Sequence, residues 1–298
     1  MVDLKGFLYG LCSSTTFGLI PFFALPLMQQ GMLFDSVLFY RFLIAGLLVG
    51  VILFVRREPF HATYRELGIL AMLSGFYTAA ALLVFMGLSY LPSGVVTTIH
   101  FLYPVFVALI MMLFFNEKRS PITITAILLA TAGVALLSSG GDAGGINLVG
   151  LVIVLFSALF NALYIVGMCR CGLRMTGLKV TFYLLMFGSL YALLLLLVRN
   201  DFQRLDGWIM LLHVVLLALV TAVISNLTLV IAVRRIGSTL TSILGAMEPV
   251  TAVAVGVLLF HETLTTSLAL GVLIILLAVG LIILARPVEE RLARLFKR

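Results

Sequence analysis

The most unusual side chain of this sequence is a carboxylate in the middle of an apolar stretch. Glu248 lies within residues 239–260, directly before Pro249. An ionised carboxylate at the centre of a bilayer costs about 2.5–3.5 kcal/mol on insertion scales, so such a group must be paired, hydrated or protonated. Glu248 can therefore bind a cationic or amino group of a ligand, or take up and release a proton. The alternative is a neutral glutamic acid that only hydrogen-bonds to neighbouring helices.

Arg41 is a second charged residue inside an apolar stretch, and three roles are open for it. It can neutralise Glu248, hold a carboxylate of a ligand, or extend outward to lipid headgroups as a structural residue.

Several polar side chains lie in other apolar stretches. Thr97, His100 and Pro104 follow an i, i+3, i+7 spacing, which places them on one stripe of a helix. Unpaired amides are costly in lipid, so asparagines should point inward, where an interhelical hydrogen bond and a ligand contact are the alternatives. The candidate ligand-binding or coupling residues are therefore Glu248, His100, Tyr103, Thr97, Asn161, Asn226, Tyr77 and Tyr164.

The sequence lacks the usual signatures of enzymes and metal sites. Cys169 and Cys171 have no second pair that would complete a zinc site, and Cys12 is distant from them. His261-Glu262 is not followed by the second histidine of a zinc protease motif, and neither a nucleophile elbow nor a phosphate-binding loop is present. We therefore expect no enzyme activity, no metal, no cofactor and no ATP-driven step.

Membrane-spanning helices must position these side chains. Of 298 residues, 63% are hydrophobic and 10% charged, whereas soluble domains carry about 25% charged residues. A water-soluble globule is thus excluded, and one crossing takes roughly 20 apolar residues. The apolar stretches are continuous rather than alternating, which favours an all-α membrane protein over a barrel. Ten transmembrane helices are predicted near 6–27, 33–55, 67–90, 94–116, 122–139, 147–168, 180–198, 208–232, 239–260 and 267–285.

The basic residues predict the orientation of these helices. With a cytoplasmic N-terminus, all of the 19 Lys and Arg residues except Arg41, Arg199 and Arg204 fall on the inner side. The positive-inside rule then places both termini in the cytoplasm of a multi-pass protein of the plasma membrane, the inner membrane in a bacterium. The net charge of +7 indicates orientation and contact with lipid, not nucleic-acid binding.

The chain contains an internal repeat. A shift of 145 aligns 92–117 with 237–262 and matches Ser93/Ser238, Pro104/Pro249, Val105/Val250, Leu113/Leu258, Phe115/Phe260 and Glu117/Glu262. We divide the chain into a first repeat at 1–140, a second at 147–286 and a basic cytoplasmic tail at 287–298. Five helices per repeat make the second copy enter the membrane from the opposite side, so the repeats are inverted and a site is expected between them at the midplane.

The motifs Tyr103-Pro-Val-Phe ending at Glu117, and Glu248-Pro-Val ending at Glu262, resemble those of the EamA family of the drug/metabolite transporter superfamily. Phe39-Tyr-Arg-Phe-Leu and Leu91-Pro-Ser-Gly-Val are further matches. The resemblance covers nearly the whole chain. It implies a ten-helix secondary carrier whose cavity is lined mainly by helices 1, 3, 4, 6, 8 and 9.

Matched prolines indicate where the binding site of such a carrier lies. Pro104 and Pro249 should kink their helices beside the cavity, because each lacks an amide proton and clashes with the preceding turn. Glu117 and Glu262 are expected to cap or gate equivalent helix ends, and a structural or gating role is favoured for Arg41.

Together these observations predict a secondary active transporter that exports small metabolites such as amino acids by alternating access. The acidic and the basic candidate favour a zwitterionic substrate, and Glu248 favours a coupling proton. A non-transporting membrane scaffold or receptor is the alternative, and it would need no polar cavity.

Overall fold

The computed structural model describes residues 3–115, 121–139, 147–173, 175–263 and 265–295, and the regular elements in these ranges are all helices. The first half of the chain contains α1 (Leu4–Gly18), α2 (Ile20–Gln29), α3 (Phe34–Val55), α4 (Tyr64–Gly87), α5 (Ser93–His100), α6 (Tyr103–Phe114) and α7 (Pro121–Ser139). The second half contains α8 (Leu148–Arg170), α9 (Gly177–Arg199), α10 (Trp208–Ala218), the π-helix η1 (Leu219–Ile224), α11 (Ser225–Gly245), α12 (Met247–Leu259) and α13 (Thr266–Leu295).

Most of these helices are long and apolar enough to cross a membrane. Seven helical segments of the described residues meet that criterion: Leu4–Gln29, Phe34–Val55, Tyr64–Gly87, Ser93–Phe114, Leu148–Met168, Gly177–Arg199 and Trp208–Ala232. Three shorter apolar helices fall in the other stretches predicted to span, at Ile124–Leu136, Met247–Leu259 and Ala269–Leu281. The chain is therefore a multi-pass integral membrane protein.

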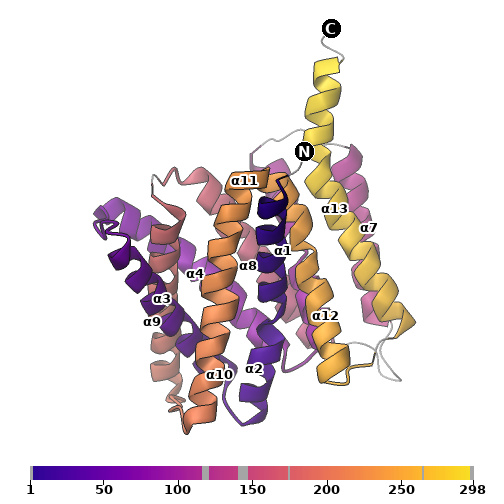
Figure 1. Ribbon diagram of the computed structural model, residues 1–298. Coiled ribbons are helices and arrows are strands. Elements are labelled where there is room, and N and C mark those ends of the chain that lie inside the picture. The colour runs from indigo at the N-terminus through magenta and orange to yellow at the C-terminus, as the bar shows by residue number, and fades with distance from the viewer. Residues whose placement is uncertain (1–2, 116–120, 140–146, 174, 264, 296–298) are drawn as a thin grey trace.

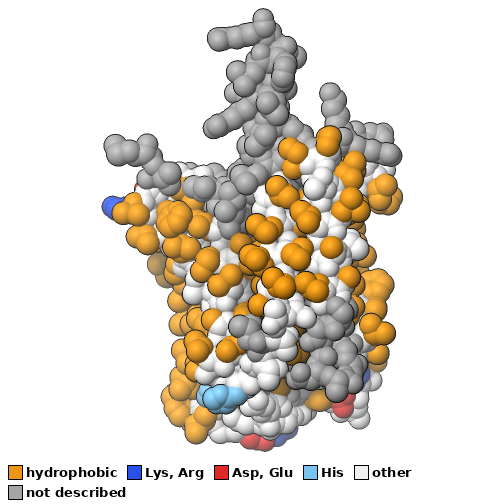
Figure 2. Space-filling view, turned by 90° about the vertical axis from the view of Figure 1, so that its right-hand side faces the viewer, with side chains coloured by type: hydrophobic (Ala, Val, Ile, Leu, Met, Phe, Trp, Pro, Cys, Tyr) orange, Lys and Arg blue, Asp and Glu red, His pale blue; other side chains and the backbone are white. Residues whose placement is uncertain are grey.

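The outer surface of the bundle is apolar. Figure 2 shows hydrophobic side chains over most of the height of the viewed face, with the visible charged groups at its ends. Phe54 and Leu128 are examples of large apolar side chains that are more than half exposed. Such an extended apolar surface would be a liability in water but is the expected boundary with lipid.

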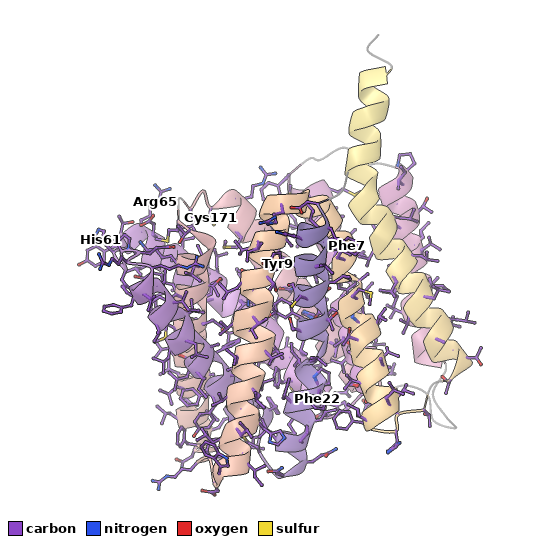
Figure 3. All side chains as sticks on the ribbon, viewed as in Figure 1. Phe7, Tyr9, Phe22, His61, Arg65 and Cys171 are labelled. Carbon is purple, nitrogen blue, oxygen red and sulfur yellow. The ribbon has the colours of Figure 1, made fainter. Side chains whose placement is uncertain are left out.

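The helices pair in a pattern that repeats between the halves. Among the described residues α3 packs on α9, α7 on α13 and α5 on α12, while the α1–α11 contact has its counterpart in α4–α8. The helix α1 begins at the end of the bundle where α8 ends, close to Cys171 (Figures 1 and 3). The first helices of the two halves thus run in opposite directions, as an inverted repeat requires.

Two boundaries differ from the sequence prediction. The helix α11 continues through Arg235, where a connection between two spans was expected. The direction of the chain nevertheless reverses within α11. Side-chain atoms of Ala232 and Leu244 both lie within 4 Å of the position that a Cβ atom would take at Gly10 of α1, whereas twelve residues of straight helix would separate the two residues by about 18 Å. The helix α13 continues to Leu295 without a break at the predicted start of the tail, and it projects beyond the bundle (Figure 1).

Side chains at the helix starts satisfy free backbone amides. Thr63 and Glu66 form a reciprocal capping box at the start of α4, and Asn147 and Thr176 cap α8 and α9. Asp3 caps α1 and also forms an ion pair with Arg235 at 3.0 Å. The hydrogen bond from Arg235 holds the pKa of Asp3 below its usual value, so this carboxylate stays ionised at more acidic pH than a free aspartate.

Candidate functional site

A cavity of about 280 Å³ lies between helices of both halves. Its size is near the lower end of the roughly 300–1,000 Å³ typical of ligand pockets, which suits a small metabolite. Helices α1 to α6, α8, α11 and α12 contribute side chains to its wall. The eight candidate residues from the sequence all line it: Tyr77, Thr97, His100, Tyr103, Asn161, Tyr164, Asn226 and Glu248.

Interrupted helices border this cavity. The regular α-helix is interrupted by a turn between His100 and Tyr103, at the α5–α6 junction, and again at Ala246, between α11 and α12. Pro104 and Pro249 lie in the first turns after these breaks, as their predicted kinks require, but neither is part of the cavity wall. Irregular backbone at membrane depth is tolerated where it is buried in protein or lines a water-filled cavity.

The carboxylate of Glu248 has no hydrogen-bond or ion-pair partner among the described residues. It lies in the first turn of α12 and lines the cavity. Arg41 lines the same cavity and interacts electrostatically with Glu248. The two charged groups form no ion pair within 4 Å among the described residues. Tyr103, the repeat counterpart of Glu248, opens α6 on the cavity wall. The two repeats thus present different chemistry from equivalent positions.

The backbone of Glu248 lies unusually close to α1. A Cβ atom at Gly18 would be 2.5 Å from the Glu248 carbonyl oxygen and 2.6 Å from Cβ of Thr251. Only glycine fits at such a distance. Gly18 is followed by a break at Leu19 and by Pro21, which lines the cavity.

Arg41 is buried, with 3% of its surface exposed, and does not reach the lipid boundary. Its Nε donates to Oγ1 of Thr221 at 3.1 Å, and its Nη2 donates to the Thr221 carbonyl at 3.2 Å. Its guanidinium carbon is 5.7 Å from the ring centre of Phe85, a distance that allows a cation–π contact. These contacts hold the guanidinium in one orientation at the cavity wall.

Thr221 lies in the π-helix η1. Single π-helical turns inside α-helices are frequent at functional sites. Oγ1 of Thr221 donates to the Leu217 carbonyl at 2.6 Å and accepts from Arg41. Thr221 could not be predicted from the sequence, because Leu219–Ile224 reads as continuous apolar helix with no proline or glycine to indicate a π-turn.

His100 is anchored by a serine that was not among the candidates predicted from the sequence. Nδ1 of His100 is 2.8 Å from Oγ of Ser157 in α8, and this oxygen is 2.8 Å from the Ala80 carbonyl of α4. Ser157 is completely buried. No local sequence signal distinguishes it from other buried serines, whereas Pro21 could have been found as a proline within the first predicted span.

Aromatic rings and amides complete the wall. Tyr77 stacks on Phe42 with ring centres 5.5 Å apart and approaches Tyr164 at 5.3 Å. Nδ2 of Asn226 donates to the Ala222 carbonyl at 2.5 Å, which is the local alternative to a ligand contact. Asn161 has no hydrogen-bond partner among the described residues.

Asn226 also lines a second cavity, of about 290 Å³. Arg56, Glu58 and Thr176 lie on its wall together with apolar residues of α3, α9 and α11. Thr176 donates to a carboxylate oxygen of Glu58 at 2.7 Å. Asn226 is therefore shared by the central cavity and a neighbouring one beside the α3–α4 connection.

The helix-end Glu262 is not part of the central cavity wall. Oε1 of Glu262 accepts from the backbone amide of Ser93 at 2.8 Å and thereby caps α5 from the α12–α13 connection. Its repeat counterpart Glu117 lies outside the described residues. Cys12 and Cys171 are free thiols, the Cys169 side chain is not described, and no metal-binding cluster occurs among the described residues.

Comparisons with known proteins agree with this architecture. A chain of a solved structure described as "Crystal structure of protein" superposes with a TM-score of 0.64 at 20% identity, covering 95% of this chain and 98% of that chain. At that identity the similarity shows the fold alone. The "Uncharacterized transporter YvbV" of Bacillus subtilis (strain 168) is 26% identical over 200 residues. That alignment spans 66% of this chain and 65% of the relative.

The model of the "EamA-like transporter family" matches residues 4–139 and again residues 148–284. The two matches together cover nearly all of the chain and fall on its two repeats. The chain therefore belongs to the EamA-like transporter family, within the drug/metabolite transporter superfamily.

Proposed function

We propose that this protein is a secondary active transporter that exports small metabolites, with amino acids as the substrate class. Ten membrane-spanning helices form two inverted five-helix repeats, and the solute binds between them. One observation carries the proposal: the carboxylate of Glu248, which has no partner among the described residues, and the buried guanidinium of Arg41 line one cavity between interrupted helices. A packed scaffold has no need for two buried charges around an empty volume.

The two charges suit a zwitterion. The carboxylate attracts an ammonium group, and the guanidinium keeps donor hydrogens beyond those given to Thr221. A carboxylate that has no partner among the described residues is also a site for proton uptake in the membrane. We infer that Glu248 binds the amino group of the solute in one state and a proton in another, which couples export to the proton gradient.

Inverted repeats supply the mechanism. Two structurally similar halves can exchange conformations, which opens the midplane site to opposite faces in turn. The candidate substrate contacts are Glu248, His100, Tyr103, Thr97, Asn161, Asn226, Tyr77 and Tyr164. Arg41, Pro104, Pro249, Glu117 and Glu262 have structural or gating roles. Both termini face the cytoplasm, in the plasma membrane that is the inner membrane of a bacterium.

Flux through purified protein tests the proposal. Proteoliposomes are loaded with each tritiated amino acid in turn, and efflux is followed with and without a pH gradient. We expect carrier-dependent efflux of at least one amino acid, faster with a proton gradient directed into the vesicle. Protein-free liposomes and the Ser14→Ala variant, whose hydroxyl bonds only within its own helix, are controls. Efflux equal to that of protein-free liposomes for every amino acid would refute the proposal.

A further inference from the structure

The hydrogen bonds around Ser157 determine which ring nitrogen of His100 carries a proton. Oγ of Ser157 has two neighbours at 2.8 Å, the Ala80 carbonyl oxygen and Nδ1 of His100. A hydroxyl has one proton, and a carbonyl oxygen only accepts. If the serine donated to His100, two oxygen lone pairs would face each other at 2.8 Å. The serine proton therefore goes to Ala80, and Nδ1 of His100 must donate to the serine.

The proton on Nδ1 determines the state of the other ring nitrogen, Nε2. In a neutral imidazole one nitrogen donates and the other accepts. No carboxylate of the described residues forms an ion pair with His100, and an isolated charge buried among apolar helices is costly. The ring is then neutral with its proton on Nδ1, and Nε2 is left as an acceptor. No described residue hydrogen-bonds to Nε2, and His100 lines the cavity.

Thr97 adds a second acceptor on the same helix stripe. Its Oγ1 donates to the Ser93 carbonyl at 2.8 Å, so its proton points back along α5. The lone pairs of that oxygen remain on a residue that lines the cavity. The carboxylate of Glu248 in α12, which is unpaired in the described part of the chain, is a third acceptor, and α5 and α12 pack on each other. This side of the cavity offers acceptors from three residues, whereas Arg41 supplies donors from α3.

We propose that His100 presents an unprotonated Nε2 as a fixed hydrogen-bond acceptor, positioned through Ser157 and Ala80, and that it selects solutes carrying an amine or ammonium N–H. The proposal rests on the transport function inferred above and deepens it by assigning the amino pole of the substrate to the α5 and α12 side. A solute that carries a carbonyl oxygen in place of the amine is excluded, because the lone pairs of that oxygen and of Nε2 would then face each other.

The first test measures the proton directly. Protein labelled with ¹⁵N-histidine is placed in lipid nanodiscs, and the His100 signals are identified by their loss in His100→Gln. The remaining histidines, His61, His213 and His261, serve as internal references. We expect a protonated Nδ1 and an unprotonated Nε2 at neutral pH. A proton on Nε2 in the unmodified protein would overturn the proposal without requiring any variant to fold.

Substitution of the serine tests the positioning step. Ser157→Ala removes the oxygen that accepts from Nδ1, so the ring should populate the other tautomer. Ser14→Ala is the matched control, because it also removes a buried hydroxyl but leaves His100 untouched. An unchanged Nδ1 signal in Ser157→Ala would contradict the assignment.

The second test uses paired solutes. L-leucine, L-phenylalanine and L-threonine are each compared with the 2-oxo acid of the same skeleton, which replaces the amine by a carbonyl. We expect the amino acids to shift the Nε2 signal at concentrations roughly tenfold or more below those of the oxo acids, since an unpaired buried acceptor is costly. Equal responses to both classes, or no response to any amino acid, would overturn the proposal. Nε2 shifts with amino acids that never cross the liposome membrane would instead refute the transport function alone.

Discussion

The anchoring of Arg41 by Thr221 gives a quantitative prediction. Thr221→Val keeps the shape of the side chain but removes the oxygen that accepts from Nε at 3.1 Å. A neutral hydrogen bond between membrane helices averages about 0.6 kcal/mol, whereas a hydrogen bond to a charged group is worth about 1.5–3 kcal/mol. Because the Thr221 carbonyl still accepts from Nη2 at 3.2 Å, we expect a loss of about 2 kcal/mol in the free energy of unfolding.

Thr228→Val is the control for this substitution. Thr228 lies in α11 and bonds only to carbonyls of its own helical segment, at 2.8 and 3.1 Å. We expect Thr228→Val to lower the free energy of unfolding by no more than about 0.5 kcal/mol. Both variants lose an own-helix bond, so the difference between them isolates the contact with Arg41.

Reversible unfolding in mixed micelles titrated with sodium dodecyl sulfate, followed by circular dichroism, measures both variants. A loss of about 2 kcal/mol changes the folding equilibrium roughly 30-fold. In an Arg41→Met background the same Thr221→Val change should cost less than about 0.5 kcal/mol, because the partner is absent. Equal losses for the two threonine variants, or an undiminished loss in the Arg41→Met background, would show that the threonine does not anchor Arg41.

Three further predictions concern α12 and its neighbours. Glu248→Gln should reduce amino-acid efflux from proteoliposomes and flatten its pH dependence, because an amide neither ionises nor takes up a proton; unchanged efflux and pH dependence would remove Glu248 from the mechanism. Gly18→Ala should destabilise the protein by about 1–3 kcal/mol in the same unfolding titration, since its Cβ would be 2.5 Å from a carbonyl oxygen; a neutral effect would contradict the close approach. Glu262→Ala should lower the free energy of unfolding by about 0.5–2 kcal/mol, because the backbone amide of Ser93 loses its acceptor. Glu262→Gln keeps an accepting oxygen and should lower it clearly less; an equal loss would show that the cap is not the cause.

Much of the architecture follows from the sequence because lipid imposes simple rules on it. Backbone groups in a bilayer must be satisfied within a helix, so apolar length predicts where helices lie. The polar residues in those stretches could be assigned to one cavity because lipid is too costly a destination for Glu248 or Asn161. Pro104 and Pro249 predicted kinks because each lacks an amide proton, and in the structure a new helix begins shortly before each of them.

The parts that could not be predicted depend on distances between helices that are remote in sequence. Ser157 reaches His100 across 57 residues and Ala80 across 77, and no periodicity encodes such pairings. The π-helix at Thr221 arises from a local change in hydrogen-bond register that its apolar residues do not signal. The continuation of α11 through Arg235 was not predicted, because the basic residues were taken to mark a non-helical connection between two spans. In the structure this charged segment remains helical where the chain reverses.

The breaks in three separate helices change what a conformational switch has to move. At Leu19, between His100 and Tyr103, and at Ala246, the chain is divided into shorter rods that end at the cavity. The ten-residue helix α2 is about 15 Å long. In the proposed transport cycle it can rotate at Leu19 while α1 keeps its position. In the alternating-access cycle proposed above, such separate segments would let the barrier on one face of the membrane open while the barrier on the other face stays closed.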